Sequence, residues 1–368
     1  MTLEYDAGPL SFEYRSFSLD LTRPLETAHG TIESRDGFVV RVGAEGGDGA
    51  GEKDGADGDD LVGYGEATPL PGFTESYADC EAALERASAA METEGPQAAL
   101  KVVDRTAAAR HAVSLALADR RAKRAASPLY RHLGEPSMVG RVPVNATIGG
   151  GSPADAVEAV REAVERGFTC CKLKAGLETV ETDVGRVRRV REAVGPSVEL
   201  RVDANGAWTY DEAAAAIDAF ADLGVSLVEQ PLPAGALEGH AALRGRGVAI
   251  GIDEGLLQHG IDAVAEADAA DVLVLKPMAL GGVDVAREVA AWAIELEIVP
   301  LVTTTIDAVV ARTGAVHLAA SIPDVPASGL ATGELLAADL AKDPVLFEKG
   351  AAVVPQAKGL GVEGVWNE

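Results

Sequence analysis

The chain has 368 residues, a hydrophobic content of 47% and a formal net charge of −26. This length supports a large buried core in one or two domains, and so negative a surface excludes nucleic acid as a partner. The apolar runs are too short to cross a membrane, and the first twenty residues lack the apolar segment of a secretory signal. We therefore expect a cytoplasmic protein that binds no membrane.

The balance of charged residues and cysteines narrows the class further. Only nine of the 32 basic residues are lysine, against 58 acidic residues. This excess favours a surface adapted to high salt, that is, a halophilic protein, although an acidic mesophilic protein also fits. The three cysteines, Cys80, Cys170 and Cys171, show no CxxC spacing. They argue against a disulfide framework and against a zinc site, so we expect them to be buried as small apolar residues.

The N-terminal part predicts a small antiparallel sheet followed by helices. Strands are expected at residues 10–32 and 37–42, and helices at 77–94 and 106–126. Between residues 42 and 61 runs GAEGGDGAGEKDGADGDD, which cannot bury apolar surface and predicts a disordered hairpin loop. Calcium binding is the alternative for this acidic run, but the twelve-residue EF-hand pattern is missing.

From Pro143 onward, short apolar strands alternate with alanine-rich helices. The strands are expected at residues 142–148, 169–174, 198–202, 226–228, 248–252, 271–275, 299–304 and, more weakly, 329–332. Helices are expected between them, for example at 153–166, 183–194, 210–221 and 282–297. About eight such units predict an α/β protein with a closed TIM-like barrel. A doubly wound sheet would need a glycine-rich phosphate loop, and GGGS at residues 149–152 lacks that spacing.

Charged residues recur where successive predicted strands end. They are Lys172, Lys174, Asp203, Glu229, Asp253 and Lys276. From Lys174 the steps are 29, 26, 24 and 23 residues, each about one strand–helix unit. In a barrel, this period brings all of them to the face where active sites lie. Six such charges predict a functional site rather than a solvated surface.

The acidic members of this set predict a metal centre. Asp203, Glu229 and Asp253 offer three carboxylates and no thiolate or imidazole, which favours Mg²⁺ or Mn²⁺ over zinc. The metal would leave positions open for a small-molecule carboxylate substrate. A purely structural cluster of ion pairs is the alternative, but it would bury charges at a cost without giving them a task.

The lysines predict proton transfer. Lys172 and Lys174 are two apart on a strand and point to the same side, into the barrel. As a base, a lysine needs a pKa lowered from about 10.4 toward about 7–8, which desolvation and neighbouring cations can achieve. Lys276 lies across the metal. The α-carbon of the substrate would then lie between the lysines, and the charge of the resulting enediolate would be stabilised by metal and Lys276.

The motifs KLK, VDAN, VEQP, IDE and LKP, which contain these residues, are similar to those of the enolase superfamily in its muconate-lactonizing subgroup. The resemblance covers nearly the whole chain. It implies a (β/α)7β barrel at residues 141–332, under an α+β capping domain at 1–140 to which the tail 333–368 returns. Lysine bases acting with Mg²⁺ are the known pattern of that superfamily.

Within this subgroup, several segments resemble the o-succinylbenzoate synthases. They are GYGEATPLPGFTES at 63–76, Arg35-Asp36-Gly37, Arg201 and VTTTIDAVVARTGAVH at 302–317. The resemblance implies that Arg35, Arg201, Thr304 and Thr305 contact substrate. It also implies a carbon–oxygen lyase that dehydrates a succinyl-hydroxycyclohexadiene carboxylate in menaquinone biosynthesis, with Lys174 as base, Lys276 as stabilising cation and Lys172 tuning Lys174.

Two alternatives remain open. An N-acylamino acid racemase or dipeptide epimerase of the same superfamily would use Lys174 and Lys276 as paired acid and base. GLATGEL at 329–335 lacks the Asp-x-Asp expected of dipeptide epimerases, and it has Ala331 where an acid is common in the synthases. The second alternative is a metal-binding scaffold without catalysis. The sequence leaves a homo-oligomer open.

Overall fold

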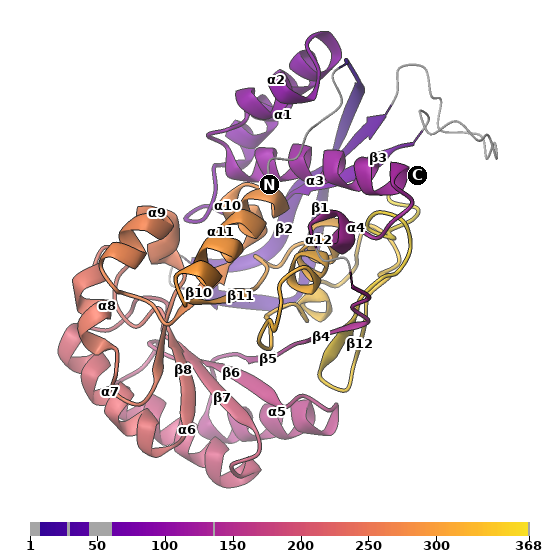
Figure 1. Ribbon diagram of the computed structural model, residues 1–368. Coiled ribbons are helices and arrows are strands. Elements are labelled where there is room, and N and C mark those ends of the chain that lie inside the picture. Colours follow the sequence, from indigo (N-terminus) through magenta and orange to yellow (C-terminus); the bar gives the residue numbers. More distant parts are fainter. Residues whose placement is uncertain (1–7, 28–29, 44–60, 135–136, 367–368) are drawn as a thin grey trace.

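The computed structural model describes residues 8–27, 30–43, 61–134 and 137–366. The acidic run after Val42, with its expected loop and its calcium alternative, lies outside these residues. A capping domain lies above a curled parallel sheet with helices on its outer side, and the C-terminal tail runs along the edge of both (Figure 1). None of the helices in these ranges is long and apolar enough to span a membrane.

The capping sheet is antiparallel and contains β1 (Ser11–Thr27), β2 (Gly30–Gly43) and β3 (Gly63–Ala67) in that order. The single strand expected at residues 10–32 is wrong, because Thr27 already pairs with Gly30 in a hairpin. The sequence also missed β3. The first error arises because a hairpin between two strands of similar composition leaves no clear break in the apolar pattern. The second arises because GYGEA, with two glycines, shows little of the apolar alternation that predicts a strand.

Helices cover one face of the capping sheet. They are α1 (Tyr77–Thr93), α2 (Pro96–Val102), α3 (Ala107–Arg124) and α4 (Leu129–His132). Ser76 caps α1 by accepting from the backbone N–H of Asp79, as serine does before a helix. Phe38 and Val40 of β2 and Leu84 of α1 share one apolar core. The bounds of α1 and α3 confirm the two long helices that the sequence predicted.

Seven parallel strands form the barrel sheet in sequential order. They are β5 (Ala146–Ile148), β6 (Cys170–Lys174), β7 (Glu199–Asp203), β8 (Val225–Glu229), β9 (Ala249–Ile252), β10 (Val272–Leu275) and β11 (Val299–Val302). The eighth position is taken by Ser328 and Gly329, which form single parallel bridges to Val144 and Thr303. The weak last strand of the sequence is therefore reduced to two bridges, and the (β/α)7β class is confirmed.

The barrel helices follow their strands along the chain. They are α5 (Pro153–Glu165), α6 (Val180–Val194), α7 (Tyr210–Asp222), α8 (Leu237–Leu243), α9 (Glu254–Glu266), α10 (Pro277–Leu280), α11 (Val283–Glu295) and α12 (Val309–Ala320). Helix α7 shows why they form. Thr209 and Glu212 make a capping box at its start, and its buried residues Ala213, Ala216, Ile217 and Phe220 have the spacing of one helical face. Phe220→Ala would cost about 3–5 kcal/mol of stability.

The tail pairs with the first residues of the barrel domain rather than with the capping sheet. A three-stranded antiparallel sheet forms from β12 (Leu346–Glu348), β13 (Ala351–Val353) and β4 (Arg141–Pro143). The strand expected at 142–148 is therefore split into β4 and β5. The tail also touches the cap, through η1 (Gly333–Leu335) and a bridge from Leu336 to Leu21.

The three cysteines are free and buried, as the sequence predicted.

Candidate active site

Six charged residues meet at the carboxyl ends of five neighbouring strands, and we call them the strand-end row. Their members are Lys172, Lys174, Asp203, Glu229, Asp253 and Lys276. The backbone register aligns Lys174 with Asp203, and Asp203 with Glu229. Asp253 and Lys276 directly follow β9 and β10. The register of parallel strands thus brings the predicted charges to one face of the barrel.

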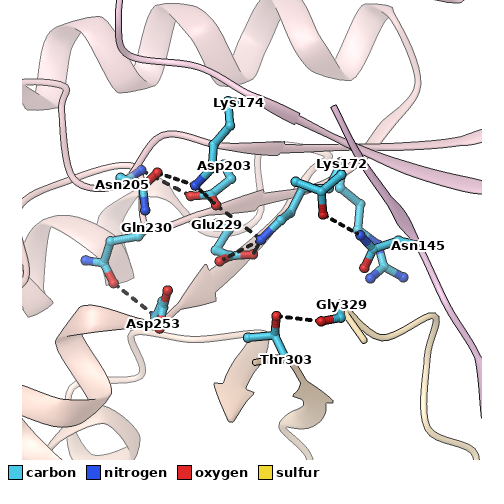
Figure 2. Close-up of polar contacts among 12 residues, drawn as sticks. Asn145, Lys172, Lys174, Asp203, Asn205, Glu229, Gln230, Asp253, Thr303 and Gly329 are labelled. Atoms are coloured by element: carbon cyan, nitrogen blue, oxygen red, sulfur yellow. Dashed lines mark hydrogen bonds and ion pairs between the residues drawn. The ribbon is translucent and has the colours of Figure 1, made fainter. Parts of the chain in front are cut away.

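The carboxylates of the row are buried and hold two of the lysines. Asp203 and Glu229 are each only 1% exposed. The Lys172 ammonium lies 2.9 and 3.0 Å from the two Glu229 oxygens and 3.1 Å from Asp203 Oδ2. Lys174 donates to Asp203 Oδ2 at 2.7 Å and to Asn205 Oδ1 at 2.6 Å (Figure 2). The two lysines therefore share one carboxylate.

Lys276 lies at the other end of the row. Its ammonium donates to Asp253 Oδ2 and stands 4.0 Å from the centroid of the Phe73 ring. Phe73 belongs to the capping domain, in the segment after β3. A cation over an aromatic face is attracted by the ring quadrupole. The cap therefore contributes one wall of the site directly beside a lysine.

The pKa values of the row follow from burial and mutual charge. Burial raises the pKa of Asp203, but the ammoniums of Lys172 and Lys174 outweigh it and the net shift is downward. Burial raises the pKa of Glu229 and brings that of Asp253 to about 6. Two of the carboxyls thus hold their protons more tightly than usual, which a cation at this place would reverse.

The pKa values of Lys172 and Lys276 are both raised by neighbouring carboxylates. Burial lowers the pKa of Lys172, but the charges of Asp203 and Glu229 raise it more. The pKa of Lys276 is raised in the same way, with Asp253 as the strongest opposing charge. Both shifts are opposite to the lowering that a base requires, because the nearest charged neighbours of these two lysines are carboxylates rather than other cations.

The acidic residues of the row fit a hard divalent cation. In the part of the chain that the structure describes, no three acidic, histidine or cysteine side chains are yet arranged around a common point as metal ligands. In the row, lysine ammonium groups lie against the carboxylates instead. The Lys172 ammonium lies between Asp203 and Glu229, and Lys276 takes one oxygen of Asp253. The other oxygen of Asp253 is buried without a hydrogen-bond partner. Three buried carboxylates with an orphan oxygen are a suitable donor set for Mg²⁺ or Mn²⁺.

Three polar residues that the sequence did not single out lie beside the row, namely Asn205, Gln230 and Glu254. Gln230 Oε1 accepts from the backbone N–H groups of Asp253 at 3.0 Å and Gly255 at 3.1 Å. Asn205 accepts from Lys174 and donates to Glu254 at 3.1 Å. Each stands in a motif beside a predicted ligand, namely VEQP, VDAN and IDE, so its position in the motif was the available signal.

The predicted substrate contacts from β11 lie at the same end of the barrel. Thr304 and Thr305 are 7% and 4% exposed. Thr304 Oγ1 lies 2.9 Å from Thr332 Oγ1, and the Thr305 hydroxyl donates to Asp307. The Thr303 hydroxyl donates to the carbonyl of Gly329 (Figure 2). It thereby joins the end of β11 to residues 329–335, which we call the closing segment because they follow the eighth position of the barrel. Their contact with substrate stays a prediction.

The two predicted arginines are engaged by other parts of the protein. Arg35 donates to the carbonyls of Thr68, Pro69 and Ile306 and is 3% exposed. Arg201 donates to Glu199 and to the carbonyl of Ala327, at 2.7 and 2.6 Å. The structure therefore gives both guanidinium groups a structural task, and their contact with substrate stays a prediction.

Comparison with known proteins places this site in a family. Residues 155–366 match the family described as enolase C-terminal domain-like. The L-Ala-D/L-Glu epimerase of Bacillus subtilis is 27% identical over 96% of both chains. The hydrophobic dipeptide epimerase of Enterococcus faecalis is 31% identical over 95% of this chain and 97% of its own length. The o-succinylbenzoate synthase of Thermobifida fusca is 38% identical, but over 60% of this chain and 69% of its own.

Solved structures point the same way. A substrate-liganded complex of the Bacillus subtilis epimerase has a TM-score of 0.87 at 26% identity, covering 97% of this chain and 99% of that one. The Enterococcus faecalis epimerase in complex with Mg and the dipeptide L-Leu-L-Tyr has a TM-score of 0.85 at 28% identity, covering 97% and 100%.

These findings correct one expectation and settle another. The expected carbon–oxygen lyase class is overturned, because the relatives that match along nearly the whole chain are epimerases, which are isomerases. The synthase matches a smaller part of the chain. The superfamily inferred from the motifs is confirmed by the family match and by the fold. The chain belongs to the enolase superfamily, as a member of its enolase C-terminal domain-like family.

Proposed function

We propose that this chain is a magnesium-dependent epimerase or racemase that inverts the α-carbon of an amino-acid derivative with a free carboxylate. The substrate is a dipeptide or an N-acylamino acid. Two full-length relatives are dipeptide epimerases, and one of them has been solved with Mg and a dipeptide. The donor set of Asp203, Glu229 and Asp253 suits the same metal.

The observation that carries the proposal is the placement of two lysines at opposite ends of the strand-end row. Lys174 ends β6 and is held by Asp203, whereas Lys276 follows β10 and is held by Asp253. Three strands lie between β6 and β10 in a sheet that curls into a barrel (Figure 1). A substrate between them would present one face of its α-carbon to each lysine.

Inversion needs one group to remove a proton and another to return it from the opposite side. Lys174 would remove the α-proton of one stereoisomer while the Lys276 ammonium delivers a proton to the other face. The two exchange roles in the reverse reaction. Lys172, between Asp203 and Glu229, would help to orient the substrate carboxylate. Bound at the three carboxylates, Mg²⁺ would supply positive charge that stabilises the substrate once its α-proton has left.

The closing segment bears on the choice of substrate. A dipeptide carries a free ammonium, whereas an N-acylamino acid does not. In GLATGEL at 329–335 the only acid is Glu334, whose carboxylate is paired with Arg166. An ammonium would therefore find no free carboxylate in this segment. We expect N-acylamino acids to be processed at least as well as dipeptides.

The test follows α-hydrogen exchange and inversion in D₂O with saturating Mg²⁺. Both stereoisomers of N-acylamino acids and of dipeptides are supplied, with exchange read by NMR and inversion by chiral chromatography. Wild type should exchange and invert at least one substrate pair. If the metal-bound protein neither exchanges nor inverts any of the N-acylamino acids or dipeptides supplied, the proposal is refuted.

The lysine variants assign the two faces. Lys174→Arg and Lys276→Arg keep the charge, but arginine does not deprotonate in proteins. Each variant should lose inversion by about 10²–10⁴-fold and should exchange the α-hydrogen of one stereoisomer only, opposite in the two variants. Lys101→Arg, at an exposed lysine of α2, is the matched control. Loss of exchange from the same stereoisomer in both lysine variants would argue against a base on each face.

A further inference from the structure

The start of α12 is capped by carboxylates from two other parts of the chain. Its own N-cap residue, Ala308, provides no side-chain cap. Glu66 of β3 accepts from the backbone N–H of Ala308 through Oε1 and of Ala311 through Oε2, both at 2.8 Å. Asp339 of the tail accepts from Val309 N–H at 2.8 Å. Negative groups at a helix start satisfy its free N–H groups and its dipole.

Glu66 is buried and is itself fixed by hydrogen bonds from other parts of the capping domain. Its side chain is 0% exposed, and Thr68 Oγ1 donates to Oε1 at 2.5 Å. Its own carbonyl lies 2.8 Å from His111 Nδ1 on α3. Burial, followed by the nearby charge of Asp307, raises the pKa of the Glu66 carboxyl to about 7, consistent with a site that excludes water.

The segment between β11 and α12 is strained. Ile306 has φ of +62°, and it is the one β-branched residue with a positive φ in the described ranges. This conformation is rare for such side chains and persists only where surrounding contacts impose it. Arg35 of β2 donates to the Ile306 carbonyl at 3.3 Å, and two residues later Glu66 binds the Ala308 N–H. The capping domain thus holds the backbone at the carbonyl of the strained residue and again two residues later.

The same segment follows three threonines whose hydroxyl groups lie at the end of the barrel that holds the strand-end row. Thr303, Thr304 and Thr305 precede Ile306 directly and lie at the carboxyl end of β11. A backbone rotation at Ile306 or Ala308 would move them relative to the strand-end row. Near-attack geometry is sensitive to such shifts, since a displacement of about 1 Å can cost about 10²-fold in rate.

We propose that Glu66, with Arg35, is a positioning residue that transmits the docking of the capping domain to the threonines of β11 by clamping the start of α12. We call this set of contacts the α12 seam; its members are Arg35, Glu66, Thr68, Ile306, Ala308, Ala311 and Asp339. The inference rests on the proposed function for its activity measurement, whereas the backbone measurement below does not depend on it.

The test replaces Glu66 and compares backbone protection with turnover. Glu66→Gln keeps the size but loses one acceptor oxygen, so the amides of Ala308 or Ala311 should exchange with solvent at least about 10-fold faster. Hydrogen exchange of the peptide over residues 303–312 reads this directly. We expect kcat/KM for α-proton exchange to fall about 10–100-fold, mainly through kcat, with the affinity for Mg²⁺ unchanged.

Asp119→Asn is the matched control. Asp119 is also 0% exposed and accepts two backbone N–H groups, from Tyr64 of β3 at 2.9 Å and from Leu360 of the tail at 2.8 Å, neither of which belongs to β11 or to the start of α12. Its replacement should lower the melting temperature but leave kcat/KM near the wild-type value. An equal loss of kcat/KM in both variants, or weaker Mg²⁺ binding in Glu66→Gln, means general destabilisation and overturns the proposal.

Thr68→Val is the second variant, in case Glu66→Gln fails to fold. It removes the hydroxyl that orients Glu66 but keeps the carboxylate. Faster exchange at residues 303–312 together with a smaller fall in kcat supports the clamp; faster exchange with unchanged kcat overturns it. If the wild type exchanges no substrate α-hydrogen, the proposed function fails by itself. Unchanged amide protection in both Glu66→Gln and Thr68→Val would then refute the clamp independently.

Discussion

The strand-end row and the α12 seam are both buried and polar, but they are assembled differently. Contacts within the row join residues 23 to 57 positions apart, on strands that are one or two strand–helix units apart in the sheet. The seam joins residues 242, 245 and 271 positions apart, from the cap and the barrel. The row follows from the repeat of the barrel, whereas the seam exists only when separate parts of the chain have docked. The proposed chemistry of the row and the proposed positioning role of the seam therefore depend on different levels of the structure.

Removal of the metal should have the largest effect, and it should act on the row alone. Excess EDTA should reduce α-proton exchange to background, a loss of at least about 10³-fold, and added Mg²⁺ or Mn²⁺ should restore it. Amide exchange at residues 303–312 should stay as it is, because the seam contains none of the three carboxylates. Full turnover in EDTA would refute the assignment of Asp203, Glu229 and Asp253 as metal ligands.

Acid should act on the far end of α12, at His317. His317 is buried, with Nε2 3.1 Å from the Leu360 carbonyl and Nδ1 accepting from Tyr130 N–H. Burial lowers its pKa from 6.5 to about 4, despite the opposing bond to Leu360. Between pH 6.5 and about 4, His317 is therefore protonated in the unfolded chain but neutral in the folded chain. The resulting stabilisation, about 3 kcal/mol, is complete above pH 6.5 and is lost as pH falls toward 4.

Urea unfolding at several pH values measures this loss. His317→Gln, which has no imidazole to protonate, should flatten the dependence of the unfolding free energy on pH between about 6.5 and 4. A slope unchanged by His317→Gln would show that other groups cause the acid sensitivity.

The support of the row should matter less than the row itself. Gln230→Met removes the oxygen that fixes the backbone of Asp253 and Gly255. We expect the Kd for Mg²⁺ to rise about 10–100-fold, as for other residues that orient metal ligands. Calorimetry measures it, with Gln356→Met in the tail as control. An unchanged Kd would mean that the neighbouring strands alone fix Asp253.

Salt should have the smallest effect and should not distinguish the two regions. Screening relieves the repulsion within a chain of net charge −26, so the melting temperature should rise between about 0.1 M and about 2 M salt. The halophilic interpretation stays a prediction until this is measured. A melting temperature independent of salt would count against it.

The sequence by itself determined the barrel, the superfamily and the members of the row. Its apolar strands recur with a regular period, and a residue at the end of a strand needs no distant partner to be recognised. It also indicated the burial of the cysteines. It misjudged the hairpin of β1 and β2 and joined β4 to β5, because pairing partners cannot be deduced from a local apolar pattern.

Tertiary structure decided the rest. The direction of the lysine pKa shifts depends on which charges lie within a few ångströms, and Glu229 reaches Lys172 only because β6 to β8 lie in register. Arg35 looked like a substrate ligand, but its donors face three carbonyls, one of them 271 residues away. Glu66 gave no signal in the sequence beyond its motif, because its carboxylate binds, apart from the Thr68 hydroxyl, backbone N–H groups. Such groups are the same at every residue, and only the docking of cap, barrel and tail selects which of them a side chain meets.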